Sequence, residues 1–354
     1  MIGLLLVAGL VYPKKTAELI FGNKTPPPTL KVAATKTAPA PRSSAPLDDL
    51  QGLRAAHQAM HFKDLLTSLP NANSPLLTKP EINQFLEAQG RNPLNLIAAA
   101  RLSHDPQYLQ EAAKAFPQDP SVQLELALHG ATAEEKAAAL KNFRELAPEN
   151  SLGDYLAAAE AFKNGDAGSA GLALAQSLDS SLFADYNSQI MESAQSALEN
   201  AGYHEEVAFG LTMGVTDLNF LNTLSRLSTD LKAVQDGFIN EADFDSAEPT
   251  VVIGLTLGQR IQESSPMLIN QLMGIAIERQ FLNQLDPLTM IGPNGQTAIE
   301  RISLLEAKRD EIKTLSQSTV ANLPSMDEAT LAQYSRLVKS QGELEALRWL
   351  KDQK

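Results

Sequence analysis

The chain has 354 residues, of which 44% are apolar and 5% aromatic, and its formal net charge is −13. This length and apolar content allow a buried core of one or two domains, which excludes disorder throughout. The sequence contains no cysteine, which excludes disulfide bridges, thiolate metal sites and cysteine nucleophiles. The acidic balance disfavours nucleic acid as a partner, because the phosphate backbone is itself negative.

The N-terminal residues are continuously apolar. Residues 2–12 read IGLLLVAGLVY and are followed by Pro13, Lys14 and Lys15. As a helix they would rise about 16 Å, roughly half of the ~30 Å hydrocarbon core of a bilayer. We predict that residues 1–15 are a membrane anchor or a signal segment. The alternatives are a cleaved signal peptide, an anchor that begins before this start, and a helix packed on the body.

Residues 16–46 are predicted to be a disordered tether rich in Pro, Ala, Thr and Lys. Residues 25–46 contain six prolines and three cations but no acid, a composition that favours an extended chain. Lys14 and Lys15 place this flank in the cytoplasm by the positive-inside rule. The tether nevertheless resembles those of bacterial envelope proteins, which hold a folded body away from the bilayer. We therefore expect a membrane-anchored protein of the bacterial cell envelope with an extracytoplasmic body.

Charge divides at the same boundary. Residues 1–46 contain six Lys and Arg and a single acid, Glu18, so the rest of the chain contains 23 Lys and Arg and 41 Asp and Glu. A basic tether beside an anionic membrane surface, with an acidic body held away from it, is electrostatically favourable.

The body is predicted to be all-α. From Leu47 onward, apolar residues recur at helical spacing and alternating strand patterns are nearly absent. Helix starts are marked by capping boxes or by an N-cap before proline: Thr78–Glu81, Thr132–Glu135, Ser325–Glu328, Asp105-Pro106 and Asp119-Pro120. Gly90 and Gly202 are predicted to end helices.

Residues 92–178 are predicted to form short helices in pairs. In residues 150–178, the small Ala158 and Ala170 lie in two helices on either side of a turn at residues 164–166. Pro117-Gln118-Asp119 recurs as Pro148-Glu149-Asn150 after 31 residues. These features resemble the tetratricopeptide repeat, whose period is about 34 residues.

The resemblance implies stacked antiparallel helix hairpins with a curved surface suited to holding another polypeptide. Asp154 departs from the family pattern, which has a large residue near the start of the first helix. An irregular helical domain is the alternative. We assign TPR-like hairpins to residues 47–182 and a C-terminal α-helical bundle to residues 183–354.

The helices lengthen in the second half. Residues 251–257 continue at helical spacing, which favours a helix over a strand. Residues 267–285 are apolar on most of their circumference, with Asn270, Gln271, Glu278 and Arg279 on the remainder, so we predict a central helix. The last two helices, near residues 297–321 and 327–352, are predicted to form an antiparallel hairpin.

Candidate metal ligands are few. His57, His61 and Asp64 would share one helix face and could hold a divalent cation. The metalloprotease motif requires a glutamate after the first histidine, where this chain has Gln58. We favour an exposed polar face. Residues 241–248 contain four acids, for which we favour a solvated turn over a calcium loop because the EF-hand glycine and terminal glutamate are missing.

The remaining candidates have simple interpretations. His104, His129 and His204 are expected to cap helices or to be solvated. The glycine-rich residues 165–171 lack the Lys-Ser/Thr of a phosphate-binding loop. Trp349 is expected to cover the core rather than to anchor a partner.

We therefore expect no catalytic, cofactor or metal residues. The function expected is that of a non-enzymatic, membrane-tethered scaffold that binds a protein or peptide partner through stacked helical hairpins, with no role for nucleic acid. The alternatives are an envelope hydrolase that uses carboxylates in a helical fold, and a structural spacer.

Overall fold

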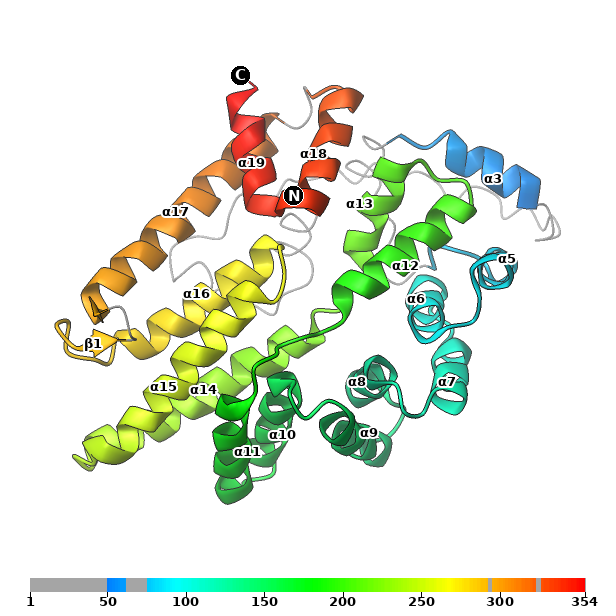
Figure 1. The fold of residues 1–354 in the computed structure, drawn as a ribbon. Helices are drawn as coiled ribbons and strands as arrows, with labels where there is room; N and C mark the ends of the chain where they lie inside the picture. Colours follow the sequence, from blue (N-terminus) through cyan, green and yellow to red (C-terminus); the bar gives the residue numbers. More distant parts are fainter. Residues whose placement is uncertain (1–49, 62–74, 292–294, 323–325, 354) are drawn as a thin grey trace, which may run out of the picture.

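The structure is a computed structural model that describes residues 50–61, 75–291, 295–322 and 326–353. The predicted all-α fold is confirmed: short helices packed in sequential pairs precede longer ones (Figure 1). The predicted anchor and tether, residues 1–15 and 16–46, lie outside the described residues. Within the described ranges, every helix is too short or too polar to span a bilayer.

The first half of the described chain consists of two leading helices and three helical hairpins, α6–α7, α8–α9 and α10–α11. The helices are α3 (Leu50–Gln58), α5 (Lys79–Gln89), α6 (Pro93–Ser103), α7 (Pro106–Ala115), α8 (Pro120–His129), α9 (Ala133–Leu146), α10 (Ser151–Lys163) and α11 (Ala167–Asp179). The hairpins follow one another along an arc, with α6, α8 and α10 on its inner side and α7, α9 and α11 outside (Figure 1).

Local sequence sets where the inner helices begin. The side chains of Asn92, Asp119 and Asn150 each accept a hydrogen bond from a backbone N–H in the first turn, which satisfies donors that have no partner inside the helix. Ala158 and Ala170 are fully buried, and their small side chains allow α10 and α11 to pack closely.

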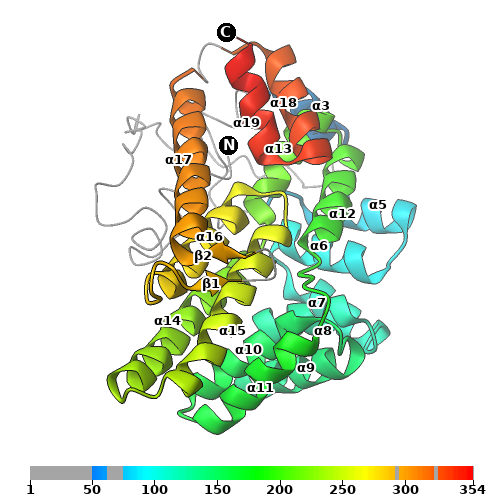
Figure 2. The same ribbon diagram turned by 60° about the vertical axis from the view of Figure 1, so that its left-hand side comes forward.

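The inner side of the arc is covered by later parts of the same chain. After α11, residues 180–186 run past the start of α10 and lead into α12 (Asn187–Asn200), which packs on α6. The long helix α14 (Asn219–Asn240) packs on α10 (Figures 1 and 2). Residues 121–126 and 151–156 are consequently buried all round.

The second half consists of longer helices and one short hairpin of strands. Its remaining elements are α13 (Glu205–Val215), α15 (Phe244–Glu263), α16 (Leu268–Leu282), β1 (Met290–Ile291), β2 (Gln296–Thr297), α17 (Ala298–Asn322), α18 (Glu328–Gln341) and α19 (Glu343–Asp352). The strands pair antiparallel, with Met290 opposite Thr297. The central helix α16 is buried on most of its circumference, as predicted, and residues 251–257 lie within α15.

Two predictions near the C-terminus are wrong. The predicted helix over residues 327–352 is two helices, α18 and α19, because the chain turns at Gly342, where φ is +88° and a side chain would meet Pro266. The N-cap of α18 is Asp327, whose carboxylate accepts the N–H of Thr330 at 2.8 Å. Ser325, the predicted N-cap, lies outside the described residues.

Candidate functional site

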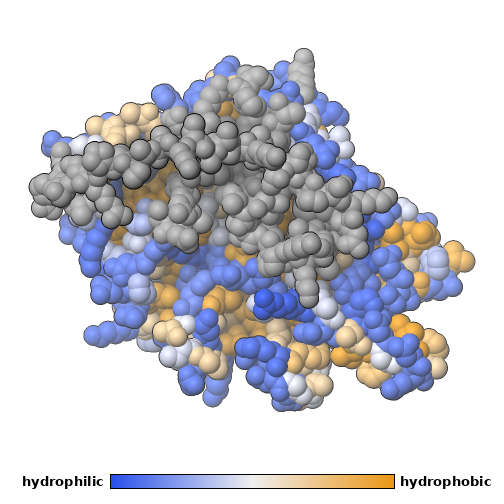
Figure 3. Space-filling view, turned by 180° about the vertical axis from the view of Figure 1, so that it is seen from behind, coloured by the Kyte–Doolittle hydropathy of each residue, from blue (hydrophilic) through white to orange (hydrophobic). Residues whose placement is uncertain are grey.

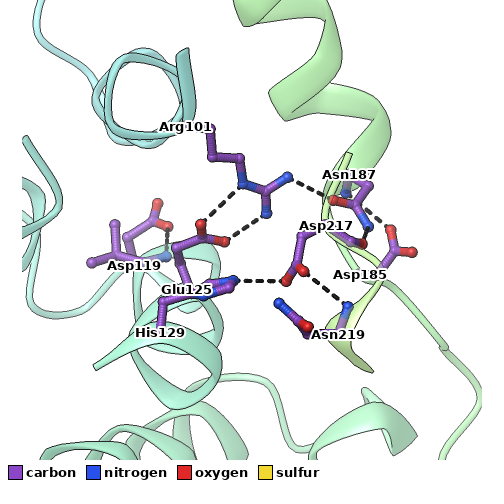
Figure 4. A network of polar contacts seen from close by, with 9 residues as sticks. Arg101, Asp119, Glu125, His129, Asp185, Asn187, Asp217 and Asn219 are labelled. Carbon is purple, nitrogen blue, oxygen red and sulfur yellow. Dashed lines mark hydrogen bonds and ion pairs between the residues drawn. The ribbon is translucent and has the colours of Figure 1, made fainter. Parts of the chain in front are cut away.

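A cluster of polar side chains, of which Glu125, Asn187 and Asp217 are buried, lies where the inner helices meet the segment between α11 and α12 (Figure 4). We call it the Arg101 cluster. It comprises Arg101 from α6, Glu125 and His129 from α8, Asp185 and Asn187 at the start of α12, and Asp217 before α14.

Arg101 is the centre of the cluster. Its Nε and Nη2 donate to the two carboxylate oxygens of Glu125 at 3.0 and 2.6 Å, and its Nη1 donates to Oδ1 of Asn187 at 2.8 Å. Burial lowers the pKa of Arg101, but the charge of Glu125 and the hydrogen bonds to it raise the pKa above its ordinary value. The guanidinium therefore stays charged and joins α6, α8 and α12.

His129 and Asp217 form the second ion pair. His129 Nε2 lies 2.9 Å from Oδ2 of Asp217, whose other oxygen accepts the N–H of Asn219 at 2.9 Å. The hydrogen bond to Asp217 raises the pKa of His129. Burial raises the pKa of Asp217, but the hydrogen bond and charge of His129 bring it below its ordinary value. Burial raises the pKa of the neighbouring Asp185.

Glu125, His129 and Asp217 are also the described residues best placed to hold a metal ion, since their ligand atoms lie within 4.8 Å of one another. Both oxygens of Glu125 already bind the Arg101 guanidinium, and the Asp217 oxygens bind His129 and Asn219. A divalent cation would have to displace these groups beside a fixed positive charge. The residues therefore fit one another better than they fit a cation, and the cluster joins helices.

A second set of contacts holds residues 180–184 against the start of α10. The amide of Asn150 donates to the carbonyl of Ala184 at 2.8 Å and accepts its N–H at 3.0 Å. Ser151 donates to the carbonyl of Leu182 through both its N–H and its hydroxyl, each at 2.9 Å. These are contacts to main-chain atoms, so the segment is held by its backbone.

Arg260 of α15 holds the start of the same segment. Its Nη1 donates to the carbonyl of Ser177 at 2.6 Å and to the Tyr155 hydroxyl at 3.2 Å, and its Nη2 donates to the carbonyl of Ser180. The guanidinium also lies over the Tyr155 ring, 6.0 Å from its centroid. One side chain thus ties α15 to α10 and α11.

A further ion pair lies within the C-terminal helices. Glu278 of α16 is fully buried and accepts two hydrogen bonds from Arg301 of α17, both at 2.9 Å, and one from Gln262 of α15. Burial raises the pKa of Glu278 in spite of these donors. Together with Gln262, the pair joins three helices. As in the Arg101 cluster, the buried negative charge is neutralised by a neighbouring guanidinium.

The structure does not test the proposed histidine site as a whole, because Asp64 lies outside the described residues. We had favoured an exposed polar helix face for His57, and this prediction is wrong. Its ring stacks on Tyr203, with centroids 3.9 Å apart, and its Nδ1 lies 3.1 Å from the carbonyl oxygen of Ala201. His57 therefore packs α3 onto the turn after α12.

Two of the remaining histidines lie at helix ends, as predicted. His104 follows α6 in a left-handed conformation, and His204 precedes α13 and bonds the carbonyl of Gln58. The prediction for His129 was incomplete: it ends α8 but pairs with Asp217, 88 residues away. Its role could not be read from neighbouring residues.

The other candidates have local roles. Of the acidic residues 241–248, residues 241–243 form the turn between α14 and α15, with Asp243 as the N-cap of α15, and residues 244–248 are the start of that helix. In the glycine-rich residues 165–171, the Asp166 carboxylate accepts the N–H of Ser169 at 2.9 Å, so the helix already has an anionic cap of its own. Trp349 is half-buried against the core, as expected.

Sequence reasoning did not predict the ion pairs Arg101–Glu125 and Glu278–Arg301. A signal was present: Glu125 interrupts the apolar run VQLELAL, and Arg101 follows LIAAA. A charge inside an apolar stretch implies a buried partner, because an unpaired charge in the core is costly. The sequence does not identify that partner.

Comparison with known proteins gives no assignment: no family model, curated protein or solved structure is significantly similar to this chain.

Proposed function

We propose that this protein is a non-enzymatic α-helical scaffold that binds a protein partner and is held at a membrane by its N-terminal residues. We take its short hairpins to be divergent members of the tetratricopeptide kind. In support, four ionisable groups of the Arg101 cluster are paired, Arg101 with Glu125 and His129 with Asp217, which is typical of a structural joint. Catalytic groups instead converge on a substrate pocket.

The proposal places the partner away from the arc of helical hairpins. The inner side of the arc already carries α12, α14 and residues 180–186. A partner there would have to displace a segment held by Arg101, Asn150 and Arg260.

One exposed apolar surface carries the proposal. It lies on the β1–β2 hairpin and the first two turns of α17, and we call it the hairpin patch. Its members are Leu288, Met290, Ile299 and Leu304, which are 73%, 61%, 45% and 56% exposed. The edge of the molecule where Figure 1 places this hairpin also shows apolar colouring in Figure 3. Grouped, exposed apolar side chains are typical of protein interaction sites.

Site-specific crosslinking in membranes tests the function. A photoreactive residue at Ser303, beside Leu304, is expected to capture the same partner in repeated experiments. The double variant Leu288→Ser, Leu304→Ser should abolish the capture. Leu172→Ser is the matched control, because Leu172 is 71% exposed on α11, far from the patch in sequence. Failure to capture any partner, or capture unaffected by the double variant, would contradict the proposal.

Shortening the tether separates the scaffold from the spacer. Removal of residues 25–46 should leave capture at Ser303 intact if the body is a binding module. A spacer would instead lose its function when the tether is shortened. No capture of a partner at Ser303 would then depend on the hairpin patch.

A further inference from the structure

This inference rests on the proposed function and specifies the partner. We propose that the hairpin patch binds an amphipathic helical segment of a partner protein that carries Lys or Arg beside its apolar residues. It is carried by an apolar surface whose exposed charged groups, among the described residues, are the carboxylates Asp286 and Glu300.

Both carboxylates are fixed in position by backbone contacts. Asp286 Oδ1 accepts the N–H of Leu288 at 2.9 Å, and Glu300 Oε2 accepts the N–H of Thr297 at 2.8 Å. The hydrogen bonds of Glu300 with the backbone and side chain of Thr297 hold the Glu300 pKa below its ordinary value, so its carboxylate is ionised at neutral pH. The two negative charges therefore lie beside Leu288 and Ile299 whether or not a partner is present.

The nearby cations face other groups. Arg301 donates both of its hydrogen bonds to the buried Glu278, and Arg279 is paired with Glu306. Lys308 is half-buried, and its Nζ lies 3.4 Å from Oε1 of Gln262. Among the described residues, the exposed charge at the patch is therefore negative, and a partner with basic groups complements it.

The shape of the patch fits one face of a helix. A shallow hollow is lined by Gly295, Gln296, Ile299, Glu300, Ser303 and Leu304. Ile299 and Ser303 are one turn apart on α17, and Leu304 lies beside them. The Met290 methyl group lies against Gly295, where an added Cβ would be 3.3 Å away, so an apolar group of the strand hairpin borders the hollow.

Charge disfavours two other occupants. A second copy would bring its own Asp286 and Glu300 to the same surface, on a chain whose net charge is already −13. An anionic lipid surface would be repelled by the same carboxylates. Dimerisation through the patch and contact of the patch with lipid are therefore outcomes that would overturn the proposal.

A single cysteine gives a site-specific reporter, because the chain has no other. We would label Ser303→Cys in the full-length protein with an environment-sensitive dye and titrate it with an amphipathic helical peptide of Leu and Lys. A matched peptide of Leu and Glu tests charge, and Ala175→Cys on the exposed face of α11 is the control position. We expect binding of the Leu/Lys peptide alone, reported at residue 303 and not at residue 175.

Two double variants separate the apolar from the charged contribution. Leu288→Ser with Met290→Ser should weaken binding of the Leu/Lys peptide at least about tenfold. Asp286→Asn with Glu300→Gln retains acceptors for the Leu288 and Thr297 N–H groups and should weaken it about fivefold, with less salt dependence. Leu172→Ser should have no effect.

The outcomes test the basic partner and the scaffold function separately. Equal binding of the Leu/Glu peptide, or affinity unchanged by the Asp286 and Glu300 substitutions, would overturn the basic partner while crosslinking at Ser303 could still support the scaffold. A dye response to protein concentration alone, or to vesicles of phosphatidylglycerol, would replace the partner by a second copy or by lipid. Failure to capture any partner by crosslinking at Ser303 would contradict both the scaffold function and the basic partner.

Discussion

Gly258 of α15 and Gly274 of α16 bring the backbones of two antiparallel helices into direct contact. A Cβ added to Gly258 would lie 2.8 Å from the carbonyl oxygen of Gly274 and 2.9 Å from the backbone nitrogen of Glu278. This close approach also places Glu278 within reach of Gln262 on α15. The two glycines thus fix the geometry around the buried Glu278–Arg301 pair.

Substitution of Gly258 by alanine should therefore be destabilising. The new methyl group would push α15 from α16, and we expect Gly258→Ala to lower the free energy of unfolding by about 2 kcal/mol. Urea denaturation followed by circular dichroism measures this change. Gly171→Ala is the control, because nothing lies within 4 Å of its Cβ position, and it should raise stability by about 0.5 kcal/mol. Equal effects at the two positions would contradict the assigned close contact.

Loss of Arg260 should loosen the joint between α15 and the α10–α11 hairpin. Arg260→Met leaves the carbonyls of Ser177 and Ser180 without this donor, and we expect a loss of about 3 kcal/mol in the free energy of unfolding. Arg309→Met is a matched control, because Arg309 bonds only the adjacent Asp310 among the described contacts, and it should change stability by less than about 0.5 kcal/mol. A loss below about 1 kcal/mol for Arg260→Met would show that the joint is held by other contacts.

The His129–Asp217 pair should make stability depend on pH. The folded pKa of His129 is raised above its ordinary 6.5, so its contribution is complete below that value and is lost as pH rises through the folded pKa. The folded pKa of Asp217 is lowered from 3.8, so its contribution is complete above that value and is lost as pH falls through the folded pKa. The pair therefore stabilises most in the weakly acidic range.

The measurement is urea unfolding at about pH 6 and about pH 9. The native protein should lose stability between the two, and His129→Gln should reduce that loss. His104→Asn, which removes a histidine outside the cluster, should leave the pH dependence intact. The same slope in His129→Gln as in the native protein would assign the dependence to other groups.

Gln235 offers a stabilising substitution. The residue is fully buried in α14, and both polar atoms of its side chain are without a hydrogen-bond partner among the described residues. Gln235→Met keeps the length of the side chain and removes unsatisfied polar atoms, so we expect the free energy of unfolding to rise by about 1 kcal/mol. Thermal and urea unfolding would detect it.

The matched control for Gln235 is Gln195→Met. Gln195 is also buried, but its Nε2 donates to Glu199 at 2.6 Å, so the same substitution should lower stability by about 1 kcal/mol. A loss of stability in Gln235→Met would indicate that ordered water satisfies that amide.

The sequence by itself determined the local structure. The apolar period specified helices, and Asp105, Asp119 and Thr132 marked helix starts, because a cap needs only the residues of its own first turn. Ala158 and Ala170 likewise marked the close contact of α10 with α11, since a hairpin brings together residues that are near in sequence. The break at Gly342 was missed because the helical period continues on both sides of it.

Tertiary structure alone decided which distant groups meet. Arg101 bonds Glu125 and Asn187, which are 24 and 86 residues away, and His129 bonds Asp217. It also decided that the inner side of the arc is covered by α12 and α14, and that Leu288, Met290 and Leu304 remain exposed. Periodicity reports which face of a helix is apolar, but the partner of that face depends on how the whole chain packs.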